Sequence, residues 1–175
     1  MTFDPKAFGE TVASILALDG AGERLMPLAH GTCSSVEARQ RLQKLSAAEL
    51  FKGSFAPDAA LSGLYLYFSC MDESHNLSQS IETVEGSFWH GILHRQEPDP
   101  GNAAYWFRRV GTHSIFPKLR EEALVLGVDF GPRWDPFAFI DLCGTGDERA
   151  LKVQRAEWQL LFDYCAAKKR GEEPS

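Results

Sequence analysis

The sequence predicts an all-α fold, a single-domain helical bundle of about seven helices around a central buried helix, covering residues 1–175. Three observations predict this class. Apolar residues recur at spacings of three and four along most segments, as they do on one face of a helix. Residues that favour helix starts precede several of these segments. The 175 residues contain no repeat and no dividing linker, and they are enough to bury one core.

The first part of the chain is expected to form three helices, each marked by its start. Asp4 can cap a helix whose first position is Pro5, where a missing N–H has no helical partner to lose. Ser34 and Glu37 form a capping-box pattern before the next helix. Asp58 precedes a third helix that is rich in aromatic residues. The expected ranges are 4–18, 36–51 and 59–71.

The central helix is expected to run unbroken over residues 74–95. Apolar residues lie on more than one of its sides, which is typical of a helix buried by its neighbours. Gly86 and Gly91 lower its helix propensity, so they indicate places where another group approaches closely. The short connection from the preceding helix favours an antiparallel hairpin of the two. The repeating apolar residues are Leu77, Ile81, Val84, Phe88 and Ile92.

Four more helices are expected after a turn rich in proline. Asn102 is expected to cap the first of them, and Gly111 to end it. The segment 123–130 is also compatible with a strand, because short apolar runs are ambiguous. Thr145 and Glu148 form a second capping-box pattern before the last helix. The expected ranges are 103–111, 118–127, 137–143 and 148–169.

A histidine pair on the central helix indicates a catalytic or metal site. His90 and His94 are four residues apart, so their imidazoles lie on one helical face and can bind one divalent metal ion. Both histidines, together with Glu82, are the candidate catalytic acid and base groups. The sequence spacing names no third metal ligand. The alternative is that these residues have no functional role. One of the two histidines would then be a hydrogen-bonded core residue, the other would pair with a carboxylate, and Glu82 would be solvated.

Cationic and aromatic side chains follow the histidine pair and are the candidate ligand-binding residues. Trp106 and Arg109 are three residues apart and share a helical face, so the guanidinium can pack over the ring. Neighbouring arginines can bind a carboxylate or phosphate in a bidentate manner. The alternative is that they pair with nearby acids and fasten the turn to the bundle. The candidate set is Arg95, Trp106, Arg108, Arg109 and His113.

The segment HGILHRQEPDPGNAAYWFRRVG resembles a string found in a family of bacterial and fungal proteins. The shared features are HGI-x-HR, an acidic turn, an asparagine and YWFRRVG. The resemblance covers residues 90–111 of the 175-residue chain. The family has no established activity, so the resemblance implies a grouping and directs attention to this segment.

Charge and cysteine content restrict the class of partner. The net charge of −6 and the pI near 5.4 argue against nucleic acid, which needs a positive surface. No apolar run is long enough to cross a membrane, and no hydrophobic leader is apparent. The four cysteines are far apart, which favours buried free thiols in a reducing compartment and a cytoplasmic location. A disulfide between two of them is the alternative.

Together these features favour a protein that binds or processes a small anionic metabolite in an inter-helix pocket lined by histidine and arginine. A divalent metal is the one cofactor indicated, and binding without a metal also fits the arginines. The alternative is a structural or protein-interaction domain. In that case residues 90–113 only stabilise the fold or a homodimer interface.

Overall fold

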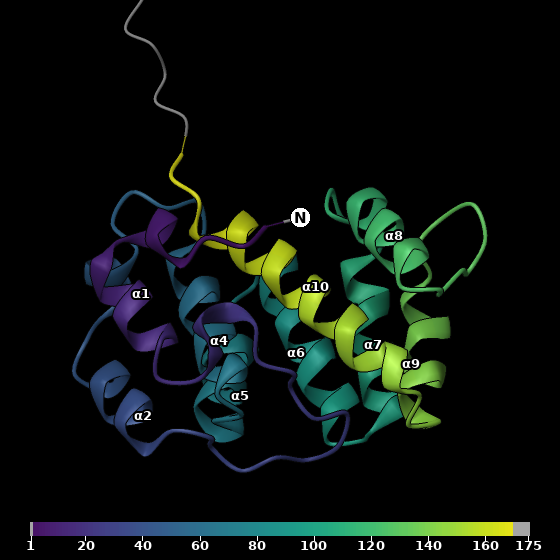
Figure 1. Cartoon of the computed structure of the whole chain (residues 1–175), viewed down its shortest axis with the longest axis horizontal. Coiled ribbons are helices and arrows are strands. Elements are labelled where there is room, and N and C mark those ends of the chain that lie inside the picture. Colours follow the sequence, from purple (N-terminus) through teal and green to yellow (C-terminus); the bar gives the residue numbers. More distant parts are fainter. Residues whose placement is uncertain (1, 170–175) are drawn as a thin grey trace, which may run out of the picture.

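The fold is all-helical, as the sequence predicts. The computed structural model describes residues 2–169, which contain ten α-helices, two 3-10 helices and no strand (Figure 1). The segment 123–130, for which a strand was the alternative, instead contains the end of helix α8 and the turn after it. The elements are η1 (Pro5–Phe8), α1 (Glu10–Leu16), η2 (Gly20–Gly22), α2 (Val36–Gln43), α3 (Ala47–Leu50), α4 (Pro57–Tyr67), α5 (Met71–Gln79), α6 (Val84–Gln96), α7 (Pro100–Val110), α8 (Phe116–Val125), α9 (Pro136–Gly144) and α10 (Glu148–Ala166).

The structure has more helices than predicted partly because one predicted helix is divided by a competing cap. Within the predicted helix 36–51, Ser46 and Glu49 form a capping box that starts α3 as a separate helix. The cap of α2 is Ser35 and not Ser34, since the Ser35 hydroxyl accepts a hydrogen bond from the Ala38 N–H. Two other caps also differ from the predicted ones: Asp99 caps α7 in place of Asn102, and Asp147 caps α10 in place of Thr145.

Helix α6 is the central element. All its residues from Glu85 to Gln96 are buried, and it packs against α4, α5 and α7. Gly91 permits the close approach of α7, because a Cβ at this position would lie 2.9 Å from the ring of Phe107. In Figure 1, α10 crosses the bundle from α9 toward the N-terminal helices, and it packs on α4 and α8. The buried central helix is therefore confirmed.

The predicted unbroken helix over residues 74–95 is wrong. The chain leaves the helical path after α5 and begins α6 at Val84, with Thr83 extended at ψ 165°. Gly86 makes this turn compatible with α6, because a Cβ there would meet the carbonyl oxygen of Ile81. Helices α5 and α6 consequently pack against each other, and α5 also packs against α4 (Figure 1). The predicted hairpin of two helices is thus three helices, α4, α5 and α6, in the structure.

The prediction of four free thiols is also wrong. Cys33 and Cys70 form a disulfide, which joins the segment before α2 to the start of α5. Cys143 and Cys165 are free and buried. The prediction of a cytoplasmic location rested in part on four reduced cysteines, and the disulfide removes that part of its support. No helix among the described residues has the length and apolar character needed to cross a membrane.

Candidate metal centre

Three histidines meet between α5 and α6. His75 lies on α5, and His90 and His94 lie one turn apart on α6. Their potential ligand nitrogens all lie within 4.8 Å of one another. The ring centroid of His90 lies 4.5 Å from that of His75 and 4.6 Å from that of His94. His90 and His94 are buried and His75 is half-buried, so the group is open toward solvent on the α5 side.

Hydrogen bonds orient the two buried imidazoles. The Nδ1 atom of His90 lies 2.7 Å from the Ser78 hydroxyl oxygen on α5. The Nδ1 atom of His94 lies 2.7 Å from Oε2 of Glu97, which follows α6 directly. Because both Nδ1 atoms are engaged, the Nε2 atoms are the ones available to a ligand. A histidine whose second nitrogen is held by a carboxylate or another polar group is the usual arrangement in metal sites.

The His90 imidazole is held in its neutral form. Burial, together with the neighbouring His94 and His75 rings, lowers its pKa from 6.5 to about 3. A neutral imidazole has a lone pair free for a cation, whereas a protonated one repels it. At neutral pH this ring is therefore ready to bind a metal ion.

Trp106 and Arg109 extend the site along α7. The Trp106 ring packs on His90 with the ring centroids 4.3 Å apart. The Arg109 guanidinium lies 5.1 Å from the Trp106 ring centroid, as the three-residue spacing predicts. Its Nη1 also lies 3.5 Å from the Tyr105 hydroxyl. Arg108 is exposed and has no hydrogen bond or ion pair within residues 2–169. The Trp106 ring therefore lies between the buried imidazole of His90 and the exposed guanidinium of Arg109.

Arg95 points to a different part of the core. It is 3% exposed, and its guanidinium donates to both carboxylate oxygens of Glu157 on α10, at 2.6 and 3.1 Å. It also donates to Gln154 at 3.1 Å and lies 4.4 Å from the ring centroid of Phe139. Its terminal nitrogens are therefore engaged by the protein, and Arg95 takes the structural ion-pair role that was the alternative to anion binding.

His113 and Glu82 lie outside the three-histidine group. The Nε2 atom of His113 lies 3.2 Å from Glu85 Oε1, and its Nδ1 accepts a hydrogen bond from the Ile115 N–H. This arrangement holds the His113 ring beside Glu85, which lies more than one helical turn before His90 on α6. Glu82 is exposed in the segment between α5 and α6. This position agrees with the alternative of a solvated Glu82, because the helix on which Glu82 was expected is broken there.

His75 is a potential ligand that the sequence does not predict. On one unbroken helix it would lie about 22 Å from His90, at 1.5 Å per residue, which excludes a shared site. A signal for the break exists in the sequence, since Thr83 precedes an acidic residue at Glu85 in the first turn of a new helix. A second group of potential ligands, His94, Glu97 and Asp99, adjoins the first and shares His94 with it.

Comparison with known proteins gives no further assignment. No protein family, no characterised protein and no solved structure has a significant match to this chain. The resemblance of residues 90–111 to a bacterial and fungal family therefore stays a prediction.

Proposed function

We propose that this protein binds a divalent metal ion of the zinc type through His75, His90 and His94, and that the ion binds or processes a small anionic molecule. The observation that carries the proposal is the convergence of three imidazoles whose two buried members are already oriented by Ser78 and Glu97. Three imidazoles with one open coordination position are a common ligand set for zinc in catalytic sites.

The geometry fits such an ion after small side-chain movements. Zinc–nitrogen bonds near 2.0–2.1 Å in a tetrahedral site separate the ligand nitrogens by about 3.3 Å. One nitrogen of each ring lies within 4.8 Å of one nitrogen of each other ring, so ring rotations that bring the ligand nitrogens closer together would close the site. His75, the half-buried member, has the most room for such a rotation.

The surrounding residues define what the open position can accept. A bound zinc-type ion supplies Lewis acidity and binds an anionic oxygen or a water. Trp106 covers one side of His90, which restricts the space beside the ion to a small molecule. Arg109 places a positive charge on the outer face of Trp106, where it attracts an anion from solvent. These features support a small carboxylate or oxoanion as the ligand.

The direct test is metal binding by purified protein. We expect one zinc ion per chain by elemental analysis and by titration of metal-free protein. His75→Ala and His94→Ala should each abolish high-affinity binding, because two imidazoles alone bind weakly. His30→Ala is the matched control, since His30 is exposed in a loop and is not part of the group. Equal zinc binding by wild type and His75→Ala would overturn the proposal.

The alternative function, a structural or interaction domain, has specific support only at Arg95. The buried pair of Arg95 with Glu157 joins α6 to α10 and needs no external ligand. If the whole segment were structural, His90→Ala would lower the free energy of unfolding and zinc would not stabilise the wild type. Zinc-dependent stabilisation of the wild type, lost in His75→Ala, separates the two proposals.

A further inference from the structure

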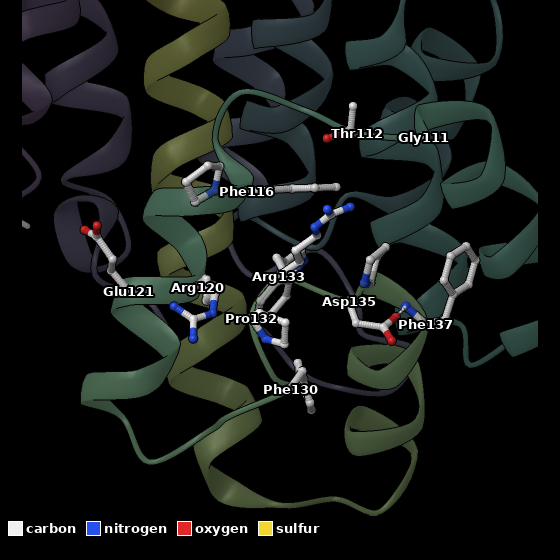
Figure 2. Close-up of a pocket in the computed structure, with 13 residues that line it drawn as sticks. Gly111, Thr112, Phe116, Arg120, Glu121, Phe130, Pro132, Arg133, Asp135 and Phe137 are labelled. Carbon is white, nitrogen blue, oxygen red and sulfur yellow. Dashed lines mark hydrogen bonds between the residues drawn. The ribbon is translucent and has the colours of Figure 1, made fainter.

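A cleft lined by residues that follow α7 is separate from the proposed metal centre. It has a volume of about 1040 Å³ and lies between the end of α7, the first turns of α8 and the segment 130–137 that leads into α9 (Figure 2). Cavities that bind small organic ligands have volumes of about 300–1000 Å³. The cleft shares no residue with the three-histidine group. The cleft is therefore separate from the histidines, and its volume is sufficient for a small organic ligand.

Aromatic rings form fixed walls of this cleft. Phe116 and Trp134 are each less than one-tenth exposed, and they are supported from behind by the core rings of Phe88 and Phe139. Phe130 lies 5.5 Å from Trp134 between ring centroids. Because these rings are held by packing, the apolar surface of the cleft exists before a ligand binds. Such walls fit a flat apolar group.

The cationic groups at the cleft are free to bind an anion. Arg133 is exposed and has no hydrogen bond or ion pair among the described residues, and Figure 2 shows its guanidinium extending into the opening. Arg120 uses its Nε to donate to the Gly131 carbonyl at 2.6 Å. This bond fixes the side chain and leaves its two terminal nitrogens without a partner in residues 2–169. The unpaired guanidinium of Arg133 suits a carboxylate, sulfonate or phosphate.

The acidic groups at the cleft are already engaged. Asp135 caps α9, and its Oδ1 accepts hydrogen bonds from the N–H groups of Phe137 and Ala138. Glu121 lies 3.2 Å from the ammonium group of Lys118 on the surface of α8. The cleft therefore offers unpaired positive charge, although the whole chain has a net charge of −6.

We propose that this cleft is a second binding site, specific for small organic anions that carry a carboxylate or phosphate on a flat apolar body. The apolar body lies against Phe116, Phe130 and Phe137, and the anionic group binds Arg133. Phe137 is 40% exposed, so it covers the body of the ligand from the solvent side. The site acts independently of the metal centre, and binding there does not require zinc.

The test uses the dye 8-anilinonaphthalene-1-sulfonate, an aromatic anion that fluoresces when its rings leave water. We expect saturable binding by metal-free protein at one site per chain. Arg133→Gln should weaken it about tenfold, the effect of losing one hydrogen bond to a charged group. Phe137→Ala should also weaken binding. Lys152→Gln is the matched control, because Lys152 is exposed on α10 and does not line the cleft.

Competition identifies the ligand class. We expect 2-naphthoate to displace the dye, and inorganic phosphate at the same concentration to leave it bound, because phosphate has no apolar body. Thermal unfolding of each variant verifies that the fold is kept. Two results would overturn the proposal: dye affinity that is the same in Arg133→Gln and wild type, or displacement by phosphate as effective as displacement by naphthoate.

Discussion

The Nδ1 atom of His94 and the Oε2 atom of Glu97 lie 2.7 Å apart, with the histidine buried and the carboxylate half-buried at the end of α6. This contact fixes the ring of a proposed metal ligand. His94 belongs to both groups of potential ligands, whereas Glu97 belongs only to the second one, which consists of His94, Glu97 and Asp99. The two groups can be separated by substitution.

Glu97→Gln should weaken zinc binding by about 10–100-fold, because the carboxylate orients His94 and increases its basicity. The measurement is a zinc titration of metal-free protein against a chelator of known affinity. Asp99→Asn should leave zinc affinity unchanged, since asparagine can still cap α7 and the three-histidine group does not include Asp99. A larger loss in Asp99→Asn than in Glu97→Gln would instead assign the metal to the second group.

Arg109→Gln should reduce the binding of small anions to zinc-loaded protein, because the guanidinium beside Trp106 is the cation proposed to attract them. The expected change is a loss of most of the thermal stabilisation that millimolar carboxylate or phosphate gives to the wild type. Arg108→Gln is the control, since it removes the same charge from the next position, where no partner exists in the described chain. Equal effects of both variants would indicate general charge attraction only.

The stability of metal-free protein should fall in acid because of His90. Its pKa is about 3 in the folded state and near 6.5 when exposed, so between these values the unfolded chain binds a proton that the folded protein does not. This group therefore leaves stability unchanged above pH 6.5 and lowers it as the pH decreases toward 3. Each pKa unit corresponds to about 1.4 kcal/mol, so the full effect is a few kcal/mol. Urea unfolding at several pH values should show a weaker pH dependence in His90→Gln.

Arg95→Ala should lower the free energy of unfolding by about 3–5 kcal/mol, because it leaves the Glu157 carboxylate buried without its partner. Denaturant titration measures this loss. Zinc affinity of the folded variant should equal that of the wild type, since Arg95 does not contact the histidines. Arg109→Ala provides the comparison, because an exposed arginine should cost less than about 1 kcal/mol. A stable Arg95→Ala protein with altered zinc affinity would assign Arg95 to the site.

Thiol counting tests the arrangement of the four cysteines. Denatured, unreduced protein should react with two equivalents of a thiol reagent, and with four after reduction, because Cys33 and Cys70 form a disulfide. In the native protein at about pH 8, Cys143 and Cys165 should react slowly. Burial raises the pKa of Cys143 to about 11, which keeps its thiol protonated. Four reactive thiols without reduction would contradict the disulfide.

The sequence predicts the class of fold and one face of the site, because both follow from local periodicity. The spacing of four residues brings His90 and His94 together, and the spacing of three brings Trp106 under Arg109, since each pair lies on one continuous helix. Long helices with strong apolar repeats are the most reliable part of such a prediction. The buried central helix follows from the same pattern.

The rest of the site depends on contacts between distant segments, which periodicity does not report. His75 reaches His90 only because the chain turns back at residues 80–83, and the apolar repeat continues through that turn without a gap. Arg95 and Glu157 are 62 residues apart, so no local pattern distinguishes that buried pair from an anion-binding arginine. The disulfide likewise joins residues 37 positions apart.

Helix α5 starts at Met71, directly after the disulfide-bonded Cys70, and His75 is only five residues beyond that covalent anchor. The chain thus has little freedom to carry this imidazole away from its two partners. Much of the entropy lost when ligands gather around an ion is therefore already lost when the protein folds. Opening of the Cys33–Cys70 disulfide would return that freedom to α5, so the oxidation state of the surroundings would change the affinity of the proposed metal site.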